Sequence, residues 1–295
     1  MNTIFQGTGV ALITPFTPDN HIDFDALNRL VEHCINGNVE YLVALGTTGE
    51  CATLSYEEQD AVRDAVIEMT QSRIPVVLGI GGNETRDIVD IMKRTDFSRI
   101  QGVLSVTPYY NKPTQAGLVA HYKALAEFCK APMILYNVPG RTGVNMTAET
   151  TLKLAREVKQ VVAVKEASGN LSQIMEIIRH RPETLAVLSG DDALALPVIA
   201  LGGEGVISVA ANAFPEEVST MVRNMLGGHY EDARTIHYAL LEFINALFVE
   251  GNPCGIKAAA HILGIAGNLV RLPLVPVSEG TYQKMESLIK ELKPH

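Results

Sequence analysis

One lysine lies inside an apolar run that is typical of a strand buried on both faces. Residues 161–164 are apolar, Lys165 follows them, and the chain is apolar again two residues later. Burial disfavours the charged ammonium form and so favours the free amine, the nucleophile that forms a Schiff base with a carbonyl substrate. The structural alternative is that Lys165 pairs with an inward-facing acid such as Glu166 or Asp191. The sequence alone leaves both interpretations open.

Four polar residues beside other apolar runs suit the rest of such a reaction. Tyr136 can relay protons between oxygen and nitrogen while an imine forms. Thr47 and Thr48 lie between two glycines, in a turn whose hydroxyl and backbone donors can bind a carboxylate. Arg141 carries a planar guanidinium that suits a second carboxylate. Singly, such residues are more often a packed ring, a plain turn and a solvated arginine, but together they indicate a site that condenses carbonyl compounds.

The elements that must position these residues alternate between strands and helices. Short β-branched runs predict eight strands, at Gly9–Pro15, Tyr41–Leu45, Pro75–Ile80, Gly102–Thr107, Pro132–Asn137, Val161–Glu166, Thr184–Ser189 and Gly205–Ala210. Amphipathic patterns between them predict helices that include Asp23–Asn36, Ser55–Thr70, Glu84–Asp96, Thr114–Lys130 and Thr147–Val158. Ser55 and Thr147 each precede early acidic residues, which is the pattern of a helix N-cap.

Strands that are apolar on both faces and separated by helices require a parallel sheet. Eight such units fit an α/β fold, the closed (β/α)8 TIM barrel, with an open doubly wound sheet as the alternative. We expect a barrel domain over residues 1–226 and a helical C-terminal domain over residues 227–295. The closing barrel helix is predicted at Pro215–Leu226, and the C-terminal helices at Tyr230–Val249, Pro253–Leu263 and Val277–Leu292. All strand C-termini of such a barrel open onto one face, which gathers the candidate residues there.

Composition excludes several classes of function. The chain has 295 residues, 47% of them hydrophobic, and a formal net charge of -9 without a basic run, so nucleic acid and anionic membranes are poor partners. Neither a membrane span nor a signal peptide is indicated, and we expect a cytoplasmic protein. The four cysteines and eight histidines show no metal-ligand spacing, and no dinucleotide or P-loop motif occurs. We therefore expect neither a metal nor a cofactor.

Several motifs together resemble a known family. Segments 46–50, 136–143 and 164–170 are similar to the signatures of the class I pyruvate-dependent aldolase and lyase superfamily, which includes N-acetylneuraminate lyase. Segment 107–113 and the surroundings of Arg141 resemble specifically the dihydrodipicolinate synthase family within it. The resemblance covers essentially the whole chain. Each motif alone is weak, but the combination is specific.

The resemblance implies a role for each residue of the proton-transfer machinery. Lys165 would form the imine with pyruvate, and Tyr136 would carry protons to and from it. Thr47 would link Tyr136 to Tyr110, and Tyr110 would enter the active site of a neighbouring subunit. The family assembles as a homotetramer, a dimer of dimers, so the same assembly is expected here.

It also implies how the two substrates bind. Thr48 would hold the pyruvate carboxylate and Arg141 the carboxylate of L-aspartate 4-semialdehyde, while Gly190 and Ile207 would place backbone carbonyls near the lysine. The product would be 4-hydroxy-tetrahydrodipicolinate, formed in the first committed step of the diaminopimelate route to lysine. Lys257, on a C-terminal helix, is expected to be structural.

Regulated members of the family bind the effector L-lysine at the dimer interface. Two of the matching positions, Tyr56 and Gln59, differ from the histidines of many regulated bacterial members, and Asp87 is one methylene shorter than the usual glutamate. A possible lysine site here comprises Cys51, Ala52, Tyr56, Gln59, Asn83, Asp87 and Tyr109.

Two alternatives remain open. A lyase that cleaves N-acetylneuraminate or a 2-keto-3-deoxy sugar acid forms the same imine, but it needs several hydroxyl partners where this chain has Tyr109, Tyr110 and Arg141. A non-catalytic sensor of keto acids needs carboxylate donors but has no use for the proton relay of Tyr136 and Thr47.

Overall fold

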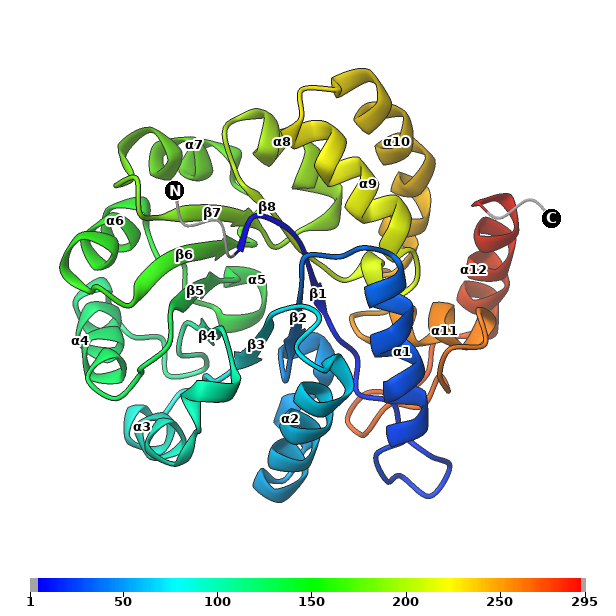
Figure 1. Ribbon diagram of the computed structural model, residues 1–295, viewed down its shortest axis with the longest axis horizontal. Coiled ribbons are helices and arrows are strands. Elements are labelled where there is room, and N and C mark those ends of the chain that lie inside the picture. The colour runs from blue at the N-terminus through cyan, green and yellow to red at the C-terminus, as the bar shows by residue number, and fades with distance from the viewer. Residues whose placement is uncertain (1–4, 293–295) are drawn as a thin grey trace.

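Eight parallel strands form a closed barrel at the centre of the molecule (Figure 1). The computed structural model describes residues 5–292. Each strand pairs with the next along the chain, and β8 closes the ring by pairing with β1. The expected (β/α)8 barrel is therefore confirmed. The strands are β1 (Gly7–Ala11), β2 (Tyr41–Ala44), β3 (Val76–Gly79), β4 (Gly102–Val106), β5 (Met133–Asn137), β6 (Val161–Glu166), β7 (Ala186–Ser189) and β8 (Gly205–Ser208).

Helices surround the barrel, and further helices follow it (Figure 1). Those of the barrel are α1 (Phe24–Asn36), α2 (Tyr56–Thr70), α3 (Thr85–Arg94), α4 (Gln115–Ala126), α5 (Pro139–Thr142), α6 (Ala148–Glu157), α7 (Leu171–His180), α8 (Ala195–Ala200) and α9 (Pro215–Leu226). The C-terminal helices are α10 (Tyr230–Ala246), α11 (Cys254–Ile262) and α12 (Glu279–Leu292). α10 packs against α9, and α12 packs against α10 and α11.

The strands bury both faces because alternate side chains point into the barrel and out toward the helices. Ile134, Ala163 and Ile207 belong to the cluster inside the barrel, whereas Leu135 and Val164 belong to the larger cluster between strands and helices. This alternation explains the continuous apolar runs of the sequence. It also fixes which strand residues can face a site at the barrel mouth.

Local sequence signals predicted most ends of the helices and strands to within a few residues of where the structure has them. Ser55 caps α2 in a complete capping box with Glu58, and the Thr147 hydroxyl caps α6. The first strand was expected to reach Pro15, which is wrong, because it ends at Ala11. The Leu12 N–H still donates to the Val43 carbonyl of β2 at 3.0 Å, but the Ile13 N–H donates to the Asn212 side chain at 3.1 Å. The short helix α5, which precedes α6 in the connection after β5, was not expected.

Among residues 5–292, no helix has both the length and the apolar composition needed to cross a membrane.

Candidate active site

Lys165 and Tyr136 lie side by side on adjacent strands, inside the barrel. Strands β5 and β6 pair so that Ile134 lies opposite Ala163, and two residues on Tyr136 lies opposite Lys165. Since side chains alternate along a strand, both residues share the inward direction of that first pair. Lys165 is only 5% exposed, and its Nζ lies 4.3 Å from the centre of the Tyr136 ring. The amine therefore has a phenol ring as its neighbour in a largely dry setting.

The two acids offered as partners for Lys165 are engaged elsewhere. Glu166 points toward the helices, where its carboxylate accepts bonds from Asn137 and Ser168, and burial raises its pKa. Asp191 accepts a bond from the Ala193 N–H at 2.9 Å. Within residues 5–292, Lys165 forms neither an ion pair nor a hydrogen bond through its amine. The ion-pair alternative is contradicted, and the amine is left available for chemistry.

The backbone after β7 packs directly against the lysine stem. A Cβ added to Gly190 would lie 3.0 Å from Lys165 Cε and 2.7 Å from the Ala167 methyl group. The buried Asp192 ties this loop to the end of β8, because it accepts bonds from the Ser208 hydroxyl and from the backbone beyond it. Ile207 lies fully buried on β8, in the same interior cluster as Tyr136. Gly190 and Ile207 thus both lie in the part of the barrel wall that surrounds Lys165.

A strained turn follows β2 and carries both threonines. Leu45 and Glu50, on either side of the segment 46–49, have φ values of 59° and 53°, a region that residues other than glycine adopt rarely. The N–H groups of Gly49 and Glu50 close the turn on carbonyls within it. Among the described residues the N–H of Thr48 has no partner, so it remains free to donate to a ligand. This is the donor geometry that a carboxylate requires.

Arg141 and Thr48 both contact one residue that the sequence patterns did not indicate. Arg141, on the short helix α5, donates from Nη2 to the backbone carbonyl of Asn252 at 3.1 Å. The Asn252 side chain donates from Nδ2 to the Thr48 hydroxyl at 3.0 Å. Asn252 lies in the connection between α10 and α11, about 200 residues from Thr48 in the chain, and no local pattern could reveal this contact.

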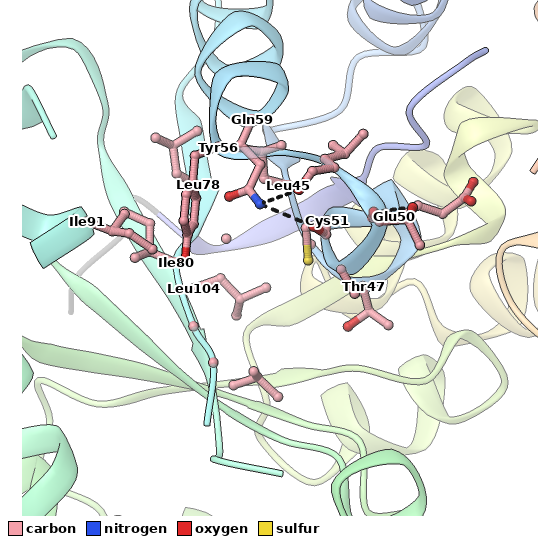
Figure 2. A pocket seen from close by; sticks show the side chains of 18 of the residues that line it. Leu45, Thr47, Glu50, Cys51, Tyr56, Gln59, Leu78, Ile80, Ile91 and Leu104 are labelled. Atoms are coloured by element: carbon pink, nitrogen blue, oxygen red, sulfur yellow. Dashed lines mark hydrogen bonds between the residues drawn. The ribbon is translucent and has the colours of Figure 1, made fainter. Parts of the chain in front are cut away.

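One cavity of about 740 Å³ is lined by part of the candidate set. Thr47, Tyr136, Arg141 and Asn252 line it, and so do all seven residues of the possible lysine site. Tyr56 and Gln59 belong to α2, and Figure 2 shows Cys51 and Thr47 below and to the right of them. Five candidates, Lys165, Thr48, Tyr110, Gly190 and Ile207, do not line this cavity. Three catalytic or substrate-binding candidates, Thr47, Tyr136 and Arg141, thus share one space with the possible lysine site, whereas Lys165 is not part of its lining.

The part of the cavity lined by α2 and α3 already has its own internal bonds. The Tyr56 hydroxyl donates to the Asp87 carboxylate, at 2.9 and 2.7 Å from its two oxygens, and this bond raises the pKa of Tyr56. Arg94 stacks over the Tyr56 ring at 4.7 Å. Gln59 donates to the backbone carbonyls of Cys51 and Leu54 (Figure 2).

The proton relay expected of Thr47, Tyr136 and Tyr110 is not joined within one chain. Among residues 5–292 no hydrogen bond connects these three side chains. Tyr110 is 88% exposed and has a φ of 72°, so its ring projects from a strained backbone rather than packing on its own chain. Tyr109 beside it lines the cavity.

Comparison with known proteins decides the family. Residues 4–292 match the model of the dihydrodipicolinate synthetase family. The chain belongs to this family. A 4-hydroxy-tetrahydrodipicolinate synthase of Phocaeicola vulgatus is 49% identical over 293 residues, which covers 99% of both chains. The dihydrodipicolinate synthase structure from Aquifex aeolicus is 41% identical, with a TM-score of 0.95 over 98% of each chain.

A third relative was solved with lysine bound. This dihydrodipicolinate synthase from Cyanidioschyzon merolae is 38% identical to the chain, with a TM-score of 0.94 over 98% of each chain. The chain is therefore a lyase of the dihydrodipicolinate synthetase family, and these relatives favour neither a sugar-acid lyase nor a sensor. In the described part of the chain no group of His, Cys, Asp and Glu side chains is arranged to hold a metal ion.

Proposed function

We propose that the chain condenses pyruvate with L-aspartate 4-semialdehyde through an imine on Lys165. The observation that supports this most directly is the unpaired, buried amine of Lys165 over the Tyr136 ring at the barrel's interior. A second buried lysine, Lys257, is a poorer nucleophile because it pairs with Glu50 at 2.5 Å and donates to the Leu269 carbonyl at 2.7 Å. Burial lowers the pKa of Lys257 to about 8, but the ion pair and the hydrogen bond both engage its amine.

The first half of the reaction forms the imine. The Lys165 amine attacks the ketone carbon of pyruvate, and Tyr136 supplies the proton with which the carbinolamine loses water. Thr48 holds the pyruvate carboxylate with its free N–H and its hydroxyl. The protonated imine then acts as the electron sink when the methyl group of pyruvate loses a proton to give the enamine.

The second half forms the carbon–carbon bond and releases the enzyme. The enamine carbon attacks the aldehyde of L-aspartate 4-semialdehyde, whose carboxylate Arg141 binds with its fork of N–H donors. The amino group of that substrate then attacks the imine carbon, the ring closes, and the lysine amine leaves. We expect the backbone carbonyls of Gly190 and Ile207 to accept hydrogen bonds from the bound intermediates.

Reduction with borohydride tests the imine. We expect pyruvate and borohydride to leave a stable pyruvyl adduct on the peptide that contains Lys165, located by mass spectrometry. Lys165→Ala should abolish the adduct, and Lys257→Met should retain it in the folded fraction. An adduct on Lys257, or none on any lysine, would contradict the proposal.

We further propose that Tyr110 completes the relay of a second subunit in a dimer, and that two dimers form a tetramer. The high exposure and positive φ of Tyr110 support this, because an unpacked aromatic ring on a strained loop suits insertion into a partner. In a two-fold dimer each subunit would give and receive the same ring.

Mixed dimers test this assembly. We expect the Tyr110→Phe enzyme to be weakly active on its own and the Lys165→Ala enzyme to be inactive. After the two exchange subunits, the mixture should regain activity. One site of the hybrid then has both an intact Lys165 and an intact partner Tyr110. The recovery should approach one quarter of the wild-type rate per total site in an equal mixture, because half of the dimers are hybrids with one complete site. Unchanged activity after exchange demonstrated by native mass spectrometry would show that each site is self-contained.

Finally, we propose L-lysine as an effector at the far end of the cavity. The shared cavity and the lysine-bound relative support this. The Tyr56 hydroxyl already bonds the Asp87 carboxylate, so a lysine ammonium must share those oxygens with it or displace it. We therefore expect weak inhibition, at millimolar lysine.

A titration of the initial rate with lysine checks this expectation. Tyr56→Phe frees the Asp87 carboxylate and should strengthen inhibition, whereas Asp87→Ala should remove it. Inhibition that is unaffected by Asp87→Ala, or absent in both the wild type and Tyr56→Phe, would contradict the assignment.

A further inference from the structure

Asn252 contacts both groups to which the proposed function assigns the substrate carboxylates. Its Nδ2 donates to the Thr48 hydroxyl at 3.0 Å, and its backbone carbonyl accepts from Arg141 at 3.1 Å. The residue is buried and lines the cavity. Its Oδ1 is buried without a donor among residues 5–292, so the side chain makes a single bond to the described protein, the one to Thr48.

The bond to Thr48 has a directional consequence. A hydroxyl group has one proton to donate and two lone pairs with which to accept. Because Asn252 occupies a lone pair of the Thr48 oxygen, the hydroxyl proton is directed elsewhere. Thr48 donates to no other described residue, which leaves its proton for a ligand.

A second contact holds the connection between α10 and α11, which carries Asn252, against the turn at residues 46–49, which carries Thr48. Glu50, which ends that turn, forms a buried ion pair with Lys257 on α11 at 2.5 Å. The Arg271 N–H donates to the other oxygen of the same carboxylate at 2.9 Å. The segment that carries Asn252 is thus fixed relative to Thr48 at two points, which limits how far the amide can move from the hydroxyl.

We propose that Asn252 is a positioning residue for pyruvate: its side-chain amide orients the Thr48 hydroxyl proton toward the pyruvate carboxylate. This inference rests on the proposed function, in which Thr48 binds that carboxylate. The side chain acts on the pyruvate end of the site alone. The contact with Arg141 uses the backbone carbonyl, which every substitution at this position retains.

Two substitutions separate orientation from mere packing. Asn252→Ala removes the donor to Thr48, and we expect the KM for pyruvate to rise roughly 10-fold. Asn252→Asp keeps the shape but replaces the donor by a carboxylate, which accepts the Thr48 proton and repels the substrate carboxylate. It should raise the KM for pyruvate several-fold more than alanine does, an order that loss of packing alone does not produce. The KM for the semialdehyde should change less than about 3-fold in both variants.

A double-mutant cycle tests whether the residue acts through Thr48. In a Thr48→Val background the hydroxyl is absent, so adding Asn252→Ala should change the KM for pyruvate less than 2-fold. Asn245→Ala, an exposed asparagine on α10 outside the cavity, is the matched control and should leave both KM values unchanged. Circular dichroism melting of each variant confirms folding, and Asn252→Asp alone decides the question if Asn252→Ala does not fold.

The outcomes distinguish this inference from the proposed function. A wild-type enzyme without a borohydride adduct on Lys165 overturns the proposed function itself. If the wild-type enzyme forms a normal adduct, any one of three results overturns the role of Asn252 and leaves the proposed function standing. These are an unchanged KM for pyruvate in Asn252→Asp, equal rises for both substrates, or additive effects with Thr48→Val.

Discussion

Gly190→Ala is expected to lower kcat by about 100-fold while leaving the fold intact. The added methyl group would lie 2.7 Å from the Ala167 methyl group and 3.0 Å from Lys165 Cε, the carbon that carries the reactive amine. One of these groups has to move. A shift of the nucleophile by about 1 Å from the attack geometry costs a reaction of this kind roughly two orders of magnitude. Steady-state kinetics with both substrates measure the effect.

Two further variants identify the cause. Ala167→Gly removes the nearer of the two colliding groups, so the double variant Gly190→Ala/Ala167→Gly should recover part of the lost kcat. Gly280→Ala, on α12, adds the same methyl group where no heavy atom lies within 4 Å, and should keep wild-type activity. Wild-type kcat in Gly190→Ala would mean that the Lys165 side chain tolerates displacement, and the tight packing would then have no catalytic role.

The sequence predicted the barrel because its signals are local. Each strand is a short apolar run, and each helix begins with features such as the Ser55 capping box, which depend only on neighbours in the chain. The same reasoning located Lys165 and Tyr136 on adjacent strand ends. The alternation of strand side chains then places both of them inside the barrel, and the pairing of β5 with β6 aligns them.

The parts of the site that escaped prediction depend on contacts between distant segments. Asn252 reaches Thr48 from the connection before α11, and Glu50 meets Lys257 from opposite ends of the sequence. The engagement of Asp87 by Tyr56 is likewise a contact between α2 and α3. Hydrophobic periodicity and capping patterns carry no information about such pairs. A single sequence could therefore identify candidate site residues but not the distant residues that contact them.

Lys257→Met should destabilise the protein by about 3–5 kcal/mol. The Lys257 and Glu50 side chains form an ion pair with side-chain exposures of 0% and 1%. Removing the ammonium leaves a carboxylate that is buried without its countercharge, and this desolvation cost is larger than the net benefit of an intact pair. The loss is measured as a lower midpoint of urea unfolding at fixed protein concentration, with the slope m unchanged.

The destabilisation expected for Lys257→Met depends on the burial of the ion pair. A double variant and a variant of an exposed ion pair test this dependence. Glu50→Gln/Lys257→Met removes both charges and should be more stable than Lys257→Met alone, because no unpaired charge is then left buried. Lys290→Met breaks an ion pair of 3.6 Å with Glu286 whose side chains are 69% and 45% exposed, and should change stability by less than about 1 kcal/mol. If Lys257→Met were as mild as Lys290→Met, water would have to reach Glu50. The ion pair of Glu50 and Lys257 could then not hold the turn that carries Thr48 against α11. It would no longer help to keep Asn252 within hydrogen-bonding distance of Thr48.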